Sequence, residues 1–188
     1  MSYTTLNVNT VKLTDDQFYH LCRANPDRQL ELSATGELII MPPVGGISGN
    51  REANLITEVN LWNRKMALGY VFSSSTIFRL PNGGKRSPDV AWVNRERWES
   101  LTPKQQEKFP PICPDFVIEL RSRTDVLSDL QEKMKEYIDS GLQLGWMLDP
   151  RQEQAEIYRP NQDVEIISFP TCLSGETVLP KFKLSLPL

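Results

Sequence analysis

The sequence predicts an α/β fold in which a mixed β-sheet has a helix packed on each face. One observation is a strand–helix–strand segment from Asp115 to Leu148, since a crossover of this kind joins two parallel strands. A second is a set of hairpin patterns before it, which add antiparallel strands. A third is the helical spacing of apolar residues between Ser48 and Leu68. Together they predict a core in the order α-β-β-β-α-β.

The first third of the chain predicts two helices with a β-hairpin between them. Thr14 and Gln17 form a capping-box pattern, which marks the start of the first helix. Gly36 lies in the turn of the hairpin, and Gly69 is expected to stop the second helix. The expected elements are a helix over 15–23, strands over 30–32 and 37–41, and a helix over 48–68.

The rest of the chain predicts mostly strands, interrupted by one polar segment and one helix. Asn82-Gly83-Gly84 is the expected hairpin turn between the strands 76–80 and 89–93. Pro103 marks a helix start in the polar segment, and Gly141 caps the later helix. The expected elements are strands over 70–72, 76–80 and 89–93, a polar surface segment over 96–108, a strand over 115–120, a helix over 128–140, and strands over 144–148, 155–158, 164–169 and 177–179.

Composition predicts one globular domain over residues 1–188, in a cytoplasmic protein. No window resembles a membrane span, and the N-terminus lacks the layout of a signal peptide. The three cysteines are widely spaced, which is typical of reduced thiols. His20 is the only histidine, so a histidine-rich zinc site is excluded and a Ser-His-Asp mechanism is disfavoured. The net charge of −3 argues against a generally basic surface that coats nucleic acid.

Three separated charged residues are the strongest functional signal. Asp89 precedes the apolar run Val90–Val93, Glu119 follows the run Phe116–Ile118, and Lys133 lies on the next predicted helix. A carboxylate in such a run is costly to bury unless a cation lies near it. Two carboxylates on neighbouring strands and an ammonium suit a hard divalent ion and a phosphodiester. Basic residues that precede Asp89 and surround Glu119 favour an anionic substrate.

This arrangement resembles the PD-(D/E)XK nuclease superfamily and, within it, the Uma family of restriction-endonuclease-like proteins. The resemblance covers the chain from Glu31 to about Tyr158. The matching pieces are Leu30-Glu31-Leu32 with Gly36-Glu37-Leu38-Ile39 and Met41, Arg86-Ser87-Pro88-Asp89-Val90, Pro114-Asp115-Phe116-Val117-Ile118-Glu119, Glu132-Lys133 with Tyr137, and Gly141 with Trp146 and Asp149-Pro150.

The resemblance implies a restriction-endonuclease-like fold and an endonuclease that cleaves DNA with Mg²⁺ or Mn²⁺. Its metal ligands would be Asp89, Glu119 and the backbone carbonyl of Leu120. The superfamily's usual E-x-K would place the lysine at position 121, where this chain has Arg121, so the catalytic lysine is expected at Lys133 instead. The resemblance also implies a homodimer, since nucleases of this superfamily are often dimeric.

The remaining residues of the predicted site have less specific roles. Arg86 and Arg121 are expected to bind substrate phosphate, because a guanidinium suits phosphate oxygens. Glu31 is a further acid of the site or a residue at a strand edge. Lys135 competes with Lys133 but should point elsewhere around the helix.

Other interpretations of the same residues remain open. Glu119 could form an ion pair with Arg121 or Arg86, and the tryptophans are expected in the core rather than stacked on bases. The main alternative function is a catalytically silent protein of the nuclease fold that binds nucleic acid or a protein partner.

Overall fold

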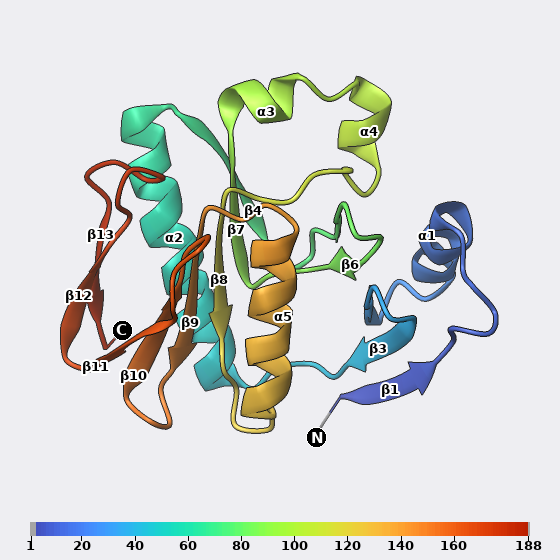
Figure 1. Cartoon of the computed structure of the whole chain (residues 1–188), viewed down its shortest axis with the longest axis horizontal. Coiled ribbons are helices and arrows are strands. Elements are labelled where there is room, and N and C mark those ends of the chain that lie inside the picture. Colours follow the sequence, from blue (N-terminus) through green and yellow to red (C-terminus); the bar gives the residue numbers. More distant parts are fainter. Residues whose placement is uncertain (1–2, 188) are drawn as a thin grey trace.

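The computed structural model describes residues 3–187 and contains the predicted mixed sheet (Figure 1). Six strands pair in the order β11-β10-β9-β8-β7-β4. β8 and β9 are parallel, as the crossover predicts, and the other pairs are antiparallel. The strands are β4 (Gly69–Ser73), β7 (Val90–Asn94), β8 (Phe116–Leu120), β9 (Leu144–Asp149), β10 (Gln154–Tyr158) and β11 (Glu165–Ser168).

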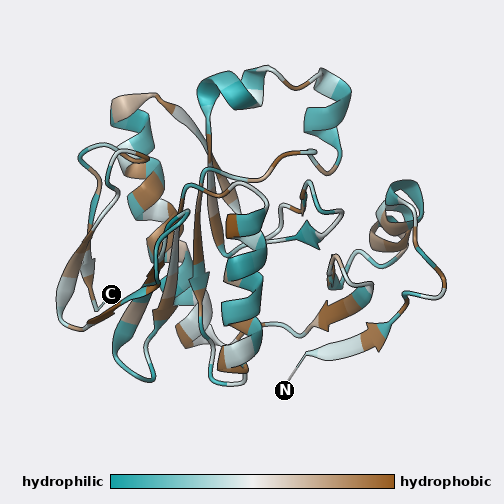
Figure 2. Cartoon of the chain, in the orientation of Figure 1, coloured by the Kyte–Doolittle hydropathy of each residue, from teal (hydrophilic) through white to brown (hydrophobic). Residues whose placement is uncertain are grey.

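Two helices cover opposite faces of this sheet, α2 (Gly46–Met66) and α5 (Leu127–Asp139). Figure 2 shows the outer side of α5 mostly hydrophilic, with hydrophobic strands behind it. Met134 and Tyr137 of α5 pack with Val117 of β8, whereas α2 packs on the face that carries Phe116 and Ile118. The sequence α2-β4-β7-β8-α5-β9 confirms the predicted order α-β-β-β-α-β.

A second, five-stranded sheet stands beside the first, in the order β1-β3-β2-β6-β5. Its strands are β1 (Thr4–Asn7), β2 (Gln29–Leu32), β3 (Glu37–Met41), β5 (Phe78–Arg79) and β6 (Lys85–Arg86). The predicted hairpin is its β2–β3 pair, and Phe18 of α1 (Asp15–Ala24) packs against one face. The capping box between Thr14 and Gln17 is confirmed.

Two expectations for turns are wrong in detail. The Asn82–Gly84 turn joins β5 to β6 rather than to the strand at 90–94, because the apolar residues of β7 pair inside the large sheet between β4 and β8. α2 ends at Met66, its C-cap Ala67 takes a left-handed conformation, and Gly69 already belongs to β4. A Cβ atom at Gly69 would lie 2.2 Å from the carbonyl oxygen of Val93, so glycine is required there by close packing.

The C-terminal part differs most from prediction. Residues 177–179 form a turn that buries Leu179 in the core rather than a strand. The neighbouring residues instead form a two-stranded sheet of β12 (Thr171–Ser174) and β13 (Lys183–Leu186), which the sequence did not predict.

The polar segment forms α3 (Arg95–Glu99) and α4 (Pro103–Glu107), and α4 begins at Pro103 as predicted. Trp62, Trp92 and Trp146 are buried, as expected of core residues. Among the described residues, no helix has the length and hydrophobicity needed to cross a membrane.

Candidate active site

Asp89 and Glu119 lie opposite each other at the same end of two neighbouring strands. Val90 of β7 pairs with Ile118 of β8 in an antiparallel ladder. Asp89, which precedes Val90, and Glu119, which follows Ile118, therefore face each other across the two strands. The Asp89 Oδ2 atom accepts the backbone N–H of Leu120 at 2.6 Å. The structure therefore brings together the two carboxylates that the sequence predicted.

The pKa values of both carboxylates are raised. Burial and the nearby charge of Glu119 raise the pKa of Asp89 well above its usual range. Burial also raises the pKa of Glu119, although Lys133 opposes the shift. Glu119 is nearly inaccessible, whereas Asp89 is partly exposed to the solvent. A group that neutralises this pair from the solvent side would therefore meet Asp89 first.

Lys133 points from α5 into this pair and is buried. Its Nζ atom lies 2.8 Å from Glu119 Oε1 and 2.9 Å from Glu31 Oε1, and it donates to the carbonyl of Ser87 at 3.4 Å. Both carboxylates raise the pKa of Lys133 despite its burial, so the ammonium stays charged. Lys135 is exposed and lines the outer part of the same cleft, and within the described residues it makes no ion pair with these carboxylates.

Glu31 is a buried ion-pairing residue of the site and comes from the second sheet. In addition to Lys133, it binds Arg86 Nη1 at 3.0 Å and accepts the backbone N–H of Ser87 at 2.8 Å. Burial alone would raise the pKa of Glu31, but Lys133 and Arg86 outweigh burial and lower it. The contacts therefore place Glu31 beside Glu119 on the same ammonium.

Two further residues complete the cluster and were not assigned from sequence. Glu136 Oε2 binds the guanidinium of Arg86, with Nη2 at 2.5 Å, and the Tyr137 hydroxyl donates to Glu119 Oε1 at 3.0 Å. Helical spacing could have identified them, because Glu136 and Tyr137 lie three and four residues after Lys133 and therefore on the same side of α5. Arg86 is thus buried between two carboxylates, and a role for it in phosphate binding stays a prediction.

Arg121 lies beside the site but binds a different acid. Its Nη1 atom is 2.5 Å from Asp149 Oδ2, and Asp149 is fully buried at the end of β9. Neither Arg121 nor Arg86 pairs with Glu119 in the described part of the chain, where Lys133 takes that place. Arg121 as a phosphate ligand also stays a prediction.

Comparison with known proteins identifies the family to which this chain is related. Residues 15–187 match the family Uma2, described as "Putative restriction endonuclease". The chain belongs to the Uma2 family. A crystal structure described as that of a putative nuclease belonging to DUF820, from Anabaena variabilis, superposes with a TM-score of 0.74 at 19% sequence identity. The superposition covers 85% of this chain and 88% of the other, and it confirms the fold. Among curated proteins, none matches the chain.

In this Uma2 protein, the charged cluster at the site has more negative than positive groups. Asp89, Glu119, Glu31 and Glu136 are four carboxylates, and Lys133 and Arg86 are the two cations that contact members of this set. If all six groups are ionised, two negative charges remain, which is the charge that one divalent cation would balance. Burial is the main cause of the raised pKa values of Asp89 and Glu119, and the neighbouring carboxylates add to it: Glu119 for Asp89, and Glu31 for Glu119.

The Uma2 site has oxygen atoms that suit a magnesium or manganese ion. Within residues 3–187, Asp89 Oδ1 and Glu119 Oε2 accept no hydrogen bond, so each carboxylate keeps one free oxygen. The described residues contain no group of three or more His, Cys, Asp or Glu side chains arranged to hold a metal. Two carboxylates nevertheless agree with Mg²⁺, which usually binds one or two of them and takes its other ligands from water and phosphate.

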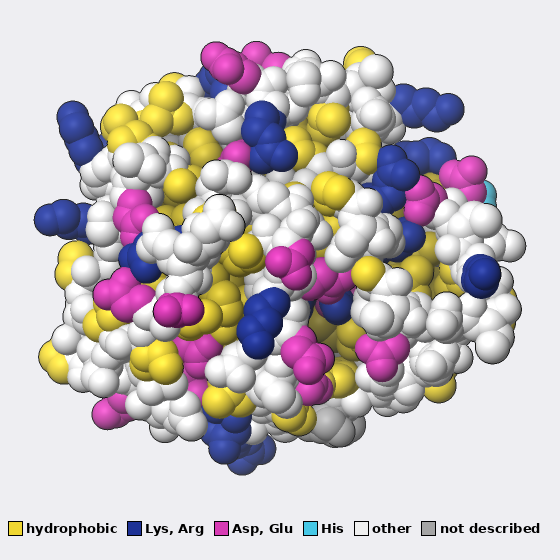
Figure 3. All heavy atoms as spheres, in the orientation of Figure 1, with side chains coloured by type: hydrophobic (Ala, Val, Ile, Leu, Met, Phe, Trp, Pro, Cys, Tyr) yellow, Lys and Arg dark blue, Asp and Glu magenta, His cyan; other side chains and the backbone are white. Residues whose placement is uncertain are grey.

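A cleft of about 1410 Å³ runs past the site in this Uma2 protein. One wall is a face of the second sheet. There Ile39 of β3 pairs with Thr5 of β1 on one side and with Glu31 of β2 on the other, so the three side chains point to the same face. The other wall includes α5 and the residues after β8. Acidic residues outnumber basic residues along the lining, and Figure 3 shows both signs intermixed on the face that carries α5. The cleft lining is therefore acidic on balance, although the basic residues near Asp89 and Glu119 favoured an anionic substrate.

Proposed function

We propose that this protein is an endonuclease that hydrolyses phosphodiester bonds of DNA and depends on Mg²⁺ or Mn²⁺. Asp89, Glu119 and the backbone carbonyl of Leu120 would hold the ion. The observation that carries the proposal is the excess of carboxylates over cations in the cluster around Asp89 and Glu119, beside the buried Lys133 ammonium. Membership of the Uma2 family and the fold of a neighbour described as a nuclease support it.

The chain's own groups have separable tasks in this reaction. A bound divalent ion would supply a Lewis acid and lower the pKa of a water molecule. The Lys133 ammonium would orient the attacking water or offset negative charge that develops on the phosphate oxygens. Glu31 and Tyr137 position the ammonium and the Glu119 carboxylate, because each binds one of them directly.

The test is an assay of the purified protein on several nucleic-acid substrates with Mg²⁺, Mn²⁺ or chelator. Single-stranded, duplex and flapped DNA are compared with the same RNA sequences. We expect metal-dependent cleavage of DNA that Asp89→Asn reduces by about a thousandfold or more, since a metal ligand is lost. Metal-independent cleavage, or equal activity of the variant, would refute the assignment. Titration calorimetry with Mn²⁺ should show weaker binding in the same variant.

The acid-rich lining of the cleft favours one alternative, a protein of this fold that binds a partner without cutting. Saturable binding of nucleic acid or of a protein, without cleavage of any substrate under any metal, would identify that function.

We also infer a homodimer, because two sites related by a two-fold axis can cut both strands of a duplex. Light scattering at micromolar concentration should give about twice the mass of the chain. A monomer mass across the whole range would contradict the inference.

A further inference from the structure

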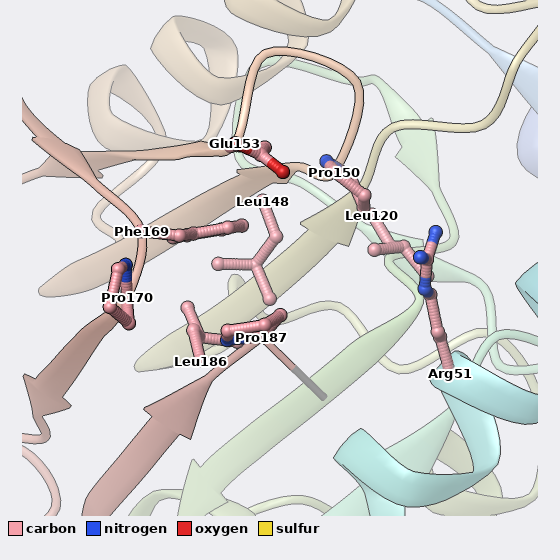
Figure 4. Close-up of a pocket in the computed structure, with 9 residues that line it drawn as sticks. All are labelled: Arg51, Leu120, Leu148, Pro150, Glu153, Phe169, Pro170, Leu186 and Pro187. Atoms are coloured by element: carbon pink, nitrogen blue, oxygen red, sulfur yellow. The ribbon is translucent and has the colours of Figure 1, made fainter.

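A second pocket, of about 200 Å³, is drawn in Figure 4. Leu120 and Leu148 in its lining belong to the core on the α2 side of the sheet, opposite to the side on which Glu119 meets α5. Its apolar walls include Leu148 of β9, Phe169 between β11 and β12, and Leu186 of β13. Leu148 and Leu186 are buried and Phe169 is half-buried, so these walls belong to the packed core. The pocket is therefore a built cavity with one aromatic ring in its lining.

This pocket continues into the candidate active-site cleft. Arg51, Leu120 and Pro150 line both spaces. Leu120 directly follows Glu119, and consecutive residues of a strand point to opposite faces. Glu119 packs under α5, whereas Leu120 belongs to the core on the α2 side. Leu120 therefore separates the carboxylate site from this pocket, and a substrate bound at Glu119 could extend past Leu120 into the pocket.

Two charged side chains border the apolar walls. Figure 4 shows Arg51 reaching from α2 beside Leu120, while Glu153 lies at the loop above Leu148. Within the described residues, neither the Arg51 guanidinium nor the Glu153 carboxylate makes an ion pair or a hydrogen bond. The pocket therefore combines an apolar interior with one free donor group and one free acceptor group at its border.

We propose that this pocket binds one nucleobase of the substrate, from the nucleotide next to the scissile phosphodiester. The base would pack on Phe169, its edge would donate to Glu153, and Arg51 would contact its phosphate. A base has flat apolar faces and a polar edge, which matches this lining. This inference rests on the proposed function, because it specifies part of the nucleic-acid substrate.

The size of the pocket restricts the substrate further. An apolar cavity of about 150 Å³ holds one benzene molecule, so about 200 Å³ suits a single base and excludes a base pair. The nucleotide in the pocket must therefore be unpaired. Single strands, flaps and mismatched sites should be better substrates than perfect duplex, in which the base must first be unstacked.

The pocket is tested first by binding, without any cleavage. The protein with labelled leucine methyl groups is titrated with the four deoxynucleoside 5′-monophosphates and with inorganic phosphate, and followed by NMR. We expect saturable shifts at Leu148 and Leu186 with nucleotides but not with phosphate. Phe169→Ala should weaken nucleotide binding about fivefold or more, because a stacking contact is lost. The matched control is Ile166→Ala, an exposed residue of β11 outside the pocket.

Glu153→Gln is a second variant, at an exposed position where the fold should tolerate the change. It should alter the order of affinity among the four nucleotides. Nucleotide binding equal to that of phosphate, or unchanged by both pocket variants, would overturn the proposal.

Cleavage then separates this proposal from the proposed function. Oligonucleotides that carry one abasic site at successive positions are cut by wild type and by Phe169→Ala. One position beside the cut should lower wild-type kcat/KM about fivefold or more but leave the variant unaffected. Cleavage without such a position would refute the pocket and keep the nuclease. Nucleotide binding without cleavage would refute the nuclease and keep the pocket.

Discussion

Glu119 and Asp149 lie at the ends of the adjacent parallel strands β8 and β9, and both are buried, yet their surroundings differ. Asp149 has Arg121 as its cation, and its other oxygen accepts the backbone N–H groups of Arg151 and Gln152 at 2.9 and 3.2 Å. Glu119 instead shares one ammonium with Glu31 and faces a further carboxylate, Asp89.

The difference separates a structural carboxylate from a candidate metal ligand in one molecule. Both oxygens of Asp149 have protein partners, so this acid needs nothing from the solvent. Asp89 and Glu119 each retain an oxygen with no hydrogen bond from residues 3–187. Burial alone thus does not indicate function, whereas burial with an unbalanced charge does.

The largest effect should come from Lys133→Ala, which leaves two buried carboxylates without their shared cation. We expect the free energy of unfolding to fall by about 4 kcal/mol and turnover to fall about a hundredfold or more. Metal affinity should be largely kept, because the ligands remain. Urea unfolding, calorimetry with Mn²⁺ and the cleavage assay measure the three quantities.

Lys135→Ala is the matched control for that variant, two positions along the same helix and exposed. It should change unfolding by no more than about 0.5 kcal/mol and leave turnover intact. Loss of cleavage in Lys135→Ala but not in Lys133→Ala would reverse the assignment of the catalytic lysine.

Arg121→Ala should destabilise the protein by about 3 kcal/mol, because Asp149 would be buried without a cation. If Arg121 also contacts the substrate, KM rises while kcat for the folded protein is kept. Arg123→Ala, at an exposed neighbouring position, is the control for stability. A complete loss of turnover with unchanged stability would show that Arg121 acts in catalysis rather than as the structural partner of Asp149.

The smallest effect, and the most direct comparison, is that of Asp89→Asn with Asp149→Asn in metal-free protein. An acid whose folded pKa is raised loses stability as pH rises from its unfolded pKa, near 3.8, towards the folded value. Asp89→Asn should therefore raise the free energy of unfolding by about 1 kcal/mol at pH 7, and this gain should vanish below pH 3.8. Asp149→Asn should lower stability at pH 7, because Arg121 loses its partner.

Urea unfolding across this pH range, with chelator and then with Mn²⁺, measures both variants. Bound metal should reverse the order of wild type and Asp89→Asn, since only wild type binds it well. A stability loss in metal-free Asp89→Asn would show that the carboxylate pair is not repulsive.

The part of the site that could be predicted from sequence lies on regular elements. Asp89 and Glu119 each border an apolar run, and two runs that pair as strands bring their ends together. Lys133 lies on the apolar side of a helix, between Leu130 and Tyr137, so its burial follows from helical spacing. These inferences need only the two-residue repeat of side chains in a strand and the 3.6-residue repeat in a helix.

The rest depends on contacts between distant segments. Glu136 binds Arg86 and the backbone N–H of Ala34, which both lie far away in sequence. The spacing of residues on the Glu136 helix cannot predict either contact. Arg121 follows a strand directly, and the sequence did not indicate that Asp149, rather than a substrate, takes its guanidinium. The turn at Asn82 was recognised from its residues, but the strand that it leads to is decided by sheet pairing.

β8 turns Glu119 and Leu120 towards opposite faces, so one strand contributes to both the carboxylate site and the second pocket. The carboxylates face α5 and the second sheet, whereas Phe169 and Leu186 come from the C-terminal segments behind them. If the pocket binds a base as proposed, substitutions at Phe169 would change the preferred base while leaving the contacts of Asp89 and Glu119 unchanged. Because Phe182, Leu184 and Leu186 pack in the same core as β8, the C-terminal segment also supports the strand that carries Glu119.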